Sequence, residues 1–216
     1  MAQPRKISAR KQPRQRRAQE TVDAILQATA RLLVDDGYEK VTTNRVAEQA
    51  GVSIGSLYQY FPSKEAIVAA LVDEHTDHML QLLAQNAEEL RGASLEDSVR
   101  TYVKAQLQAH AMEPELHRAL VEQLPRLHGF DRVREINLQA IALVEAFFGQ
   151  HAHRIRVKDL HLAAYICVHA VEANTHAAIL DGPQRLNDVK LAEELCHLVL
   201  RYLLDDYPPG RGQHVQ

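Results

Sequence analysis

The chain has 216 residues, of which 46 % are hydrophobic and 25 % charged, as in an ordinary globular protein. It is long enough to bury a core without disulfide or metal staples, and no run approaches the ~20 apolar residues of a membrane span. Residues 1–64 hold 11 Lys and Arg against 6 Asp and Glu, whereas the whole chain has a net charge of −3. This asymmetry favours a polyanionic partner, and a solvated basic tail on an ordinary protein is the alternative.

Residues 1–17 contain seven Lys and Arg, no acid and two prolines, which predicts a disordered basic arm. The arm could lie in the minor groove of DNA or add only salt-dependent attraction, and we favour the second interpretation. No apolar stretch follows the basic residues, so the sequence predicts no secretory signal and a cytoplasmic location.

A helical period begins at Ala18 and ends at Gly37, a residue type that commonly closes helices. Its apolar face holds Val22, Ile25, Leu26, Thr29, Leu32 and Leu33. Residues 42–51 and 53–60 then predict two short helices, because threonine and serine hydroxyls at their starts accept free backbone N–H groups. Ser63 begins a longer helix that links the basic part to the acidic part.

Residues 41–64 read VTTNRVAEQAGVSIGSLYQYFPSK. Two short helices joined by a Gly-containing turn match the helix-turn-helix pattern, and the second is too polar and short to be stable alone. Such a helix fits the major groove of DNA, where side chains meet base edges. A helical hairpin inside a bundle is the alternative.

The acidic part continues the helical pattern. Ser94 caps one helix, Pro114 suits the first turn of a short one, and further helices are expected at about 131–148, 158–180 and 187–204. We see no internal repeat and no convincing strand. The sequence therefore predicts an all-α fold of about nine helices.

The 41–64 block and the residues before it resemble the DNA-binding domain of the TetR family of transcriptional regulators. The resemblance covers about residues 18–70 and lies in Gly37-Tyr38, Thr42-Thr43, Val46-Ala47, Ala50-Gly51-Val52-Ser53, Gly55-Ser56, Leu57-Tyr58, Tyr60-Phe61 and Lys64. Tyr60 stands where many members have histidine, and Asn44 occupies a variable base-reading position, so the operator sequence stays open.

The resemblance implies a three-helix, helix-turn-helix DNA-binding domain at the N-terminus and a helical ligand-binding and dimerisation domain at the C-terminus. The expected divisions are a basic arm at 1–17, the DNA-binding domain at 18–64, the ligand-binding and dimerisation domain at 65–206 and a disordered tail at 207–216. The longer helix after Ser63 would then be the mechanical link between the two domains.

The same resemblance assigns roles to residues of the block. Thr42, Thr43, Tyr58, Tyr60 and Lys64 are expected to contact phosphate, Asn44 and Arg45 to read bases, and Ser53, Ile54, Gly55 and Ser56 to form the leading edge of the recognition helix. Ile54 could pack on a thymine methyl group. For each tyrosine, a place in the core is the alternative.

In the family, the last two long helices of each subunit form the dimer interface. The stripes that suit this role are Ala163, Ile166, Ala170, Ala173 and Ala177 on one helix and Leu191, Leu195, Leu198, Val199 and Tyr202 on the other. Burial of both stripes inside one subunit is the alternative. The candidate ligand-binding residues, each of which could equally be ordinary packing or surface, are Tyr102, Gln106, His110, Leu120, Phe147, Tyr165, His169, Glu172 and His176.

His161, His169 and His176 share roughly one side of their predicted helix, and Glu172 precedes His176 by four residues. Their spacing is too long for one zinc ion without ligands from another helix, so we favour a polar or pH-responsive face. Cys167 and Cys196 lie in apolar patterns and are expected to be buried small hydrophobes rather than redox groups. We expect no metal and no cofactor.

These features predict a ligand-responsive regulator, most simply a repressor that binds a palindromic operator as a homodimer and is released by a small-molecule effector. The expected partners are double-stranded operator DNA, a second copy of the chain and an unidentified small effector, with no membrane. An architectural DNA-binding protein without effector is one alternative. An enzyme that uses the His-rich part is another, but the chain has no H-E-x-x-H motif, Gly-rich phosphate loop or C-x-x-C pair.

Overall fold

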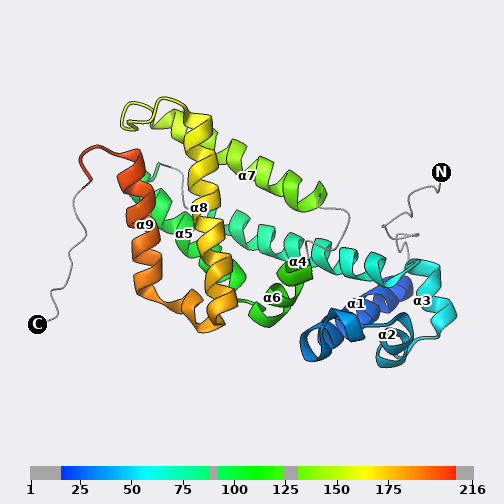
Figure 1. Ribbon diagram of the computed structural model, residues 1–216. Helices are drawn as coiled ribbons and strands as arrows, with labels where there is room; N and C mark the ends of the chain where they lie inside the picture. Colours follow the sequence, from blue (N-terminus) through cyan, green and yellow to red (C-terminus); the bar gives the residue numbers. More distant parts are fainter. Residues whose placement is uncertain (1–15, 88–91, 124–130, 208–216) are drawn as a thin grey trace, which may run out of the picture. The chain divides into compact units, whose positions relative to one another are not determined.

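The computed structural model describes residues 16–87, 92–123 and 131–207 and is helical throughout, with no strand in those three ranges (Figure 1). This confirms the predicted all-α class. The α-helices of these ranges are α1 (Arg16–Asp36), α2 (Thr43–Gln49), α3 (Ile54–Tyr60), α4 (Lys64–Ala87), α5 (Leu95–His110), α6 (Pro114–Gln123), α7 (Asp131–Gln150), α8 (Leu160–Asp181) and α9 (Val189–Leu203). Two short 3₁₀ helices, η1 (Tyr38–Lys40) and η4 (Pro183–Asn187), connect α1 to α2 and α8 to α9.

Side-chain hydroxyls fix where the short helices α2 and α3 begin. The Thr42 side chain accepts a hydrogen bond from the Arg45 backbone N–H, and the Ser53 side chain accepts one from Ser56. Between these two helices Gly51 has a φ of 67°, a left-handed conformation that costs glycine little and other residues more. The turn between α2 and α3 is therefore set by local sequence.

The chain divides into two compact units, which are described separately. Unit 1 comprises residues 1–78 and 115–132, and within it α1 contacts α2 and α2 contacts α3 (Figure 1). Its core is built from the apolar faces of α1 to α4 and from α6. The largest fully buried side chains of this core are Phe61, Ile25, Leu33, Leu57 and Ile67.

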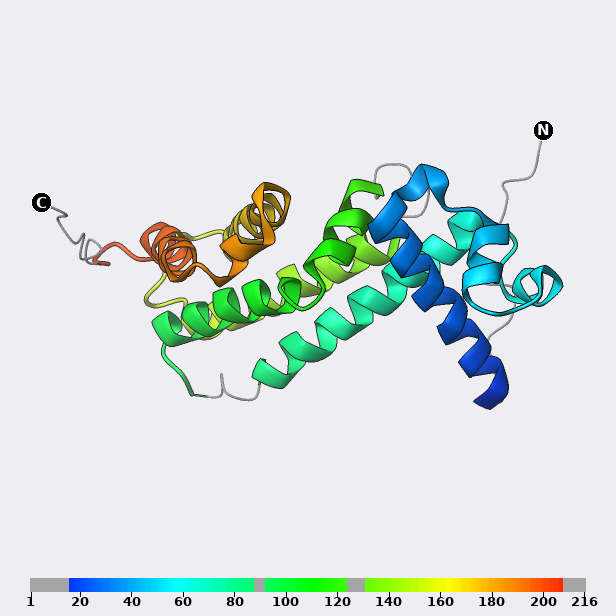
Figure 2. The same ribbon diagram turned by 90° about the horizontal axis from the view of Figure 1, so that it is seen from below.

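Unit 2 comprises residues 79–114 and 133–216. Its core draws on α5, α7, α8 and α9, and α5 lies against both α8 and α9 (Figures 1 and 2). Many of the contact residues on α8 are small, such as Ala163 and Ala164, both 0 % exposed. Small side chains let neighbouring helices approach closely, so α8 is packed into the unit along one side.

The division differs from the domain boundary expected at residue 64. The first half of α4 belongs to unit 1 because Ala66, Ile67, Val68 and Leu71 are buried in its core. The short helix α6 joins the same core through Leu116 and Leu120. A linear boundary could not capture this, since α6 follows α5 in sequence and still packs with the N-terminal helices.

Helix α1 begins at Arg16, two residues before the expected start at Ala18. The remainder of the predicted basic arm and the tail after Tyr207 lie outside the described residues. In the described ranges no helix combines the length and the apolar character that a bilayer crossing requires.

Candidate functional site

The helix-turn-helix pattern forms a pair of short helices, α2 and α3, in unit 1. The hydroxyls of Thr43 and Tyr58 lie 3.1 Å apart, which joins the start of α2 to the middle of α3. Leu57 is 0 % exposed and is the buried residue of α3 that anchors the helix to the core. Two of the predicted phosphate-contacting hydroxyls are thus brought side by side.

One face of α3 is open to solvent. Ile54 is 39 % exposed and Tyr58 43 % exposed, although both are large side chains that burial would favour. Ser53 and Gly55 are exposed as well, and a Cβ added at Gly55 would meet only the Ser53 hydroxyl, at 3.8 Å. This face can approach another surface closely, as a recognition helix must.

Of the remaining predicted DNA-binding residues, Thr42 and Asn44 are exposed and Ser56 and Tyr60 half-buried. Arg45 and Lys64, also half-buried, turn toward their own unit. Arg45 Nη2 forms an ion pair with Asp36 at 2.5 Å, and Nη1 donates a hydrogen bond to the Lys40 carbonyl. The bond from Arg45 lowers the pKa of the Asp36 carboxyl. Arg45 thus joins α2 to the end of α1, and its guanidinium is engaged there rather than free to contact a base.

Lys64, at the start of α4, lies over the Tyr38 ring with Nζ 3.9 Å from the ring centroid. The same ammonium donates a hydrogen bond to the Tyr38 carbonyl at 3.1 Å. A cation over an aromatic ring is held electrostatically by the ring's negative face. Lys64 therefore anchors α4 to η1.

Residues 51–55, Gly-Val-Ser-Ile-Gly, also have the G-x-S-x-G spacing of a hydrolase nucleophile. That motif works on a sharp strand-to-helix turn, which exposes an activated serine. Here the segment joins two helices, and the Ser53 hydroxyl is engaged with the backbone N–H and the hydroxyl of Ser56. Ser53 serves as the cap of α3, so the segment lacks the strand-to-helix turn that the motif requires.

Unit 2 contains a cavity of about 520 Å³ lined by α5, α7 and α8, with Leu80 of α4 and Val199 of α9. This volume lies within the range of about 300–1,000 Å³ of small-molecule sites. None of the described residues that line it carries a charged side chain at neutral pH. Leu143 lines the cavity and is 72 % exposed, so among the described residues the mouth lies on the α7 side.

Two of the predicted ligand-binding residues, Tyr102 and Phe147, line this cavity. Burial raises the pKa of Tyr102 to about 12, and its hydroxyl accepts a hydrogen bond from Gln106 Nε2 at 3.2 Å. Gln106 thus positions Tyr102 and does not line the cavity. Sequence reasoning missed Ser98, which lines the cavity one helical turn before Tyr102 and is 3 % exposed. The four-residue step between the two was the available signal.

Leu120, another predicted ligand-binding residue, lies in the core of unit 1 and does not line the cavity. The reason is that α6 packs with the N-terminal helices. Tyr165 is 49 % exposed and also does not line the cavity. Its ring meets the His169 ring edge-on, with centroids 4.5 Å apart.

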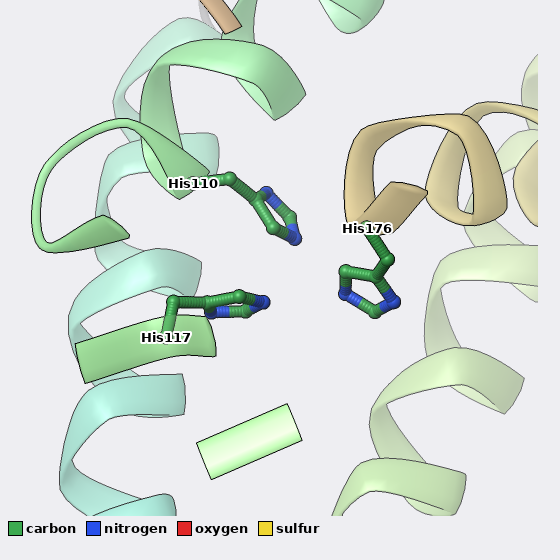
Figure 3. A group of neighbouring side chains, drawn as sticks. All are labelled: His110, His117 and His176. Atoms are coloured by element: carbon green, nitrogen blue, oxygen red, sulfur yellow. The ribbon is translucent and has the colours of Figure 1, made fainter. Parts of the chain in front are cut away.

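The other predicted residues form polar pairs on and between helices of unit 2. Glu172 is 3.3 Å from both His169 Nδ1 and Asn137 Nδ2, which links α8 to α7. The rings of His110 on α5 and His176 on α8 are neighbours, with centroids 5.2 Å apart (Figure 3). Burial lowers the pKa of His176. His161 instead meets Glu145, so the three histidines of α8 have different partners.

The remaining histidine labelled in Figure 3, His117 of α6, belongs to unit 1. Its Nδ1 lies 2.9 Å from Nε2 of His75 on α4, and both side chains are buried. One ring must donate and the other accept, so this pair fixes complementary tautomers. It holds α6 against α4 within unit 1.

The predicted dimer stripes split into buried and exposed members. Ala163, Leu195 and Val199 are buried in the core of unit 2, because those sides of α8 and α9 face α5. Ala170, Leu191 and Tyr202 are half-buried, whereas Ala173 and Ala177 are exposed. Ile166 and Leu198 are 39 % and 50 % exposed. Large apolar side chains that also remain open on α8 are Leu162, Tyr165 and Leu180.

Both cysteines are free and buried. Burial raises the pKa of the Cys167 thiol to about 12 and also raises that of Cys196. A buried neutral thiol behaves as a small hydrophobic group. Cys167 lines the cavity in that form.

Comparison with known proteins places both units in one family. Residues 25–71 match the model of bacterial regulatory proteins of the tetR family, and residues 94–203 match the tetracyclin repressor-like C-terminal domain. The A-factor receptor protein of Streptomyces griseus is 41 % identical over 63 residues, which cover 29 % of this chain and 23 % of that protein. The chain thus spans about a quarter of the length of this curated relative.

Solved structures agree with the fold at low sequence identity. A putative TetR-family regulator from Mesorhizobium loti superposes with a TM-score of 0.66 at 16 % identity, covering 88 % of this chain and 100 % of that one. A structure described as a SmeT–triclosan complex gives 0.62 at 19 % identity and covers 88 % and 95 %. With a family model matched across its C-terminal half and another across its helix-turn-helix, the chain belongs to the TetR family of regulators.

Proposed function

We propose that this chain is a ligand-responsive transcriptional regulator: a repressor that binds a palindromic operator as a homodimer and leaves it when a small effector fills the cavity of unit 2. The observation that carries the proposal is the exposed face of α3, where Ile54 and Tyr58 stay open to solvent and Tyr58 meets Thr43 of α2. Such a regulator acts on DNA in the cytoplasm and is a binding protein rather than an enzyme.

On DNA, Thr43 and Tyr58 would direct their adjacent hydroxyls to one phosphate, while Ser53, Ile54 and Gly55 approach the base edges. Asn44, exposed in the first turn of α2, is the side chain best placed to add a base contact. Arg45 and Lys64 would support this surface through Asp36 and Tyr38.

A second copy of the chain is the expected partner of the open apolar sides of α8 and α9. Ile166, Leu180 and Leu198 are each at least 39 % exposed there, and packing these apolar side chains against a second copy would remove them from water. In such a dimer two α3 helices would meet DNA one helical turn apart, about 34–36 Å, or a multiple of that distance.

The cavity favours the ligand-responsive regulator over an architectural DNA-binding protein, which needs no such space. One structural neighbour is described as a SmeT–triclosan complex, and one relative is named a receptor, which supports this choice. Helix α4 is continuous from Lys64, and its Leu80 lines the cavity. We expect an effector to favour one position of α4, and so one spacing of the two α3 helices.

The proposal is tested by fluorescence anisotropy with DNA from upstream of the protein's own gene. Gly55→Glu places a carboxylate on the exposed face of α3, where a Cβ has room, so folding should be retained and DNA affinity should fall at least 100-fold. The matched control is Gly149→Glu near the end of α7, where a Cβ meets nothing within 4 Å. Equal affinity for all DNA sequences, or no loss in the Gly55 variant, would contradict the proposal.

A further inference from the structure

The cavity in unit 2 has walls that are almost entirely hydrocarbon. Val144, Phe147 and Phe148 of α7 face it together with Val168 and Val171 of α8. Among the described lining residues, the polar groups are few and uncharged. An ion that entered would lose its water without gaining a charged partner, which is strongly unfavourable. The lining therefore selects against carboxylates and ammonium groups inside the cavity.

One polar atom in this wall has no partner. The Ser98 side chain is 3 % exposed and lines the cavity, yet its hydroxyl makes no hydrogen bond to any residue that the structure describes. Buried hydroxyls are nearly always hydrogen-bonded, because burial without a partner costs free energy. An unpaired hydroxyl on a residue that lines the cavity thus marks a place where a ligand's polar group can be bound.

Tyr102 adds a second polar group on the same side of α5, four residues after Ser98. Its hydroxyl oxygen already accepts a hydrogen bond from Gln106 Nε2, at 3.2 Å. That bond leaves the phenolic proton free to donate. A ligand oxygen placed between the two residues could accept from both hydroxyls.

We propose that the effector is a neutral, largely hydrocarbon molecule with one uncharged oxygen group, such as a ketone, ester or lactone carbonyl, held by Ser98 and Tyr102. The inference rests on the proposed function, whose effector it describes by chemical class. Phe147 and the valines of α7 and α8 would enclose the hydrocarbon part, whose burial supplies most of the affinity.

The experiment uses the full chain and a fluorescent hydrocarbon, 1,6-diphenylhexatriene, which has no polar atom. Displacement is measured with three molecules of the same chain length: decan-2-one, decanoate and decylammonium. At pH 7.5 decan-2-one should displace the probe at concentrations at least tenfold lower than either ion. Equal displacement by decanoate would overturn the neutral class of ligand.

The polar contact is tested with Ser98→Ala, with Gln108→Ala on the exposed side of α5 as control. Ser98→Ala should lower the affinity for decan-2-one at least fivefold. The affinity for diphenylhexatriene should stay unchanged, because this hydrocarbon needs no hydrogen bond. An equal change for both molecules would indicate a merely structural role and would overturn the assignment.

A cavity-filling pair tests the location. Ala140→Phe on the cavity side of α7 should reduce diphenylhexatriene binding, whereas Ala146→Phe on the exposed side should not. DNA release is followed separately. Release of the DNA by an anion but not by the ketone would overturn the inference about the ligand class and leave the proposed regulator function standing. Selective binding of the ketone by a chain that never binds DNA would support the ligand class and contradict the proposed regulator function.

Discussion

The docking of α3 onto unit 1 depends on one fully buried side chain, and replacing it should separate local from global stability. Leu57 is 0 % exposed, whereas the other residues of α3 are exposed or half-buried. Leu57→Ala removes buried methyl groups and leaves a cavity, which typically costs about 2–5 kcal/mol. A helix of seven residues has no stability of its own to set against that loss.

We therefore expect α3 to open locally in Leu57→Ala while the other helices of the unit hold. Hydrogen exchange of the amides of residues 54–61 should accelerate, and DNA affinity should fall at least tenfold, since ~1.4 kcal/mol is a factor of ten. The circular dichroism spectrum, which reports the total helix content, should change little.

The matched control lies on the same helix. Ile54 is 39 % exposed, so Ile54→Ala should cost about 1 kcal/mol or less in the free energy of unfolding. It should still weaken DNA binding, because the exposed side chain is lost from the recognition surface. Wild-type exchange protection in Leu57→Ala, or equal destabilisation by both variants, would refute the reasoning.

Three further outcomes follow from the ionisable groups. The ion pair with Arg154 lowers the pKa of Glu96. Arg154→Gln should therefore lower the free energy of unfolding above about pH 4.5, and the difference from wild type should disappear as the pH falls through the Glu96 pKa. Urea unfolding from pH 3 to 7 tests this. Burial lowers the pKa of His176, so the unfolded chain binds the proton more readily and stability falls as pH drops below about 6.5. His176→Gln should flatten that part of the stability profile, and an unchanged slope would contradict the assignment. The Cys167 pKa of about 12 predicts slow alkylation by iodoacetamide at pH 8 in the folded protein and rapid alkylation in guanidinium, and equal rates would show that the thiol is not protected.

Local chemistry explains why the helical order could be predicted from the sequence. Thr42, Ser53 and Ser94 each cap a helix through a hydroxyl, and Gly51 takes the left-handed turn that follows α2. These signals depend on neighbouring residues only. The same is true of Leu57, whose burial follows from its place among polar neighbours on α3.

The partners of long side chains could not be predicted in this way. Arg45 and Lys64 look like free cations in sequence, but Asp36 and Tyr38 lie at distances that only the folded unit 1 creates. Leu120 has the same apolar character as a ligand-binding residue, and only the packing of α6 assigns it to another core. Ser98 gave only the four-residue step to Tyr102 as a signal, because a single serine in an apolar helical pattern is otherwise ordinary.

The central claim is that α3 is the surface that reads DNA, once from each subunit of a dimer. Ser56→Cys on α3 can be labelled with iron–EDTA, since Cys167 and Cys196 are both buried and should not react. On operator DNA the account predicts two patches of strand cleavage separated by one helical turn, about 34–36 Å, or a multiple of it. A single patch, or no cleavage from α3 while a label at Gly149→Cys cuts the DNA, would contradict it.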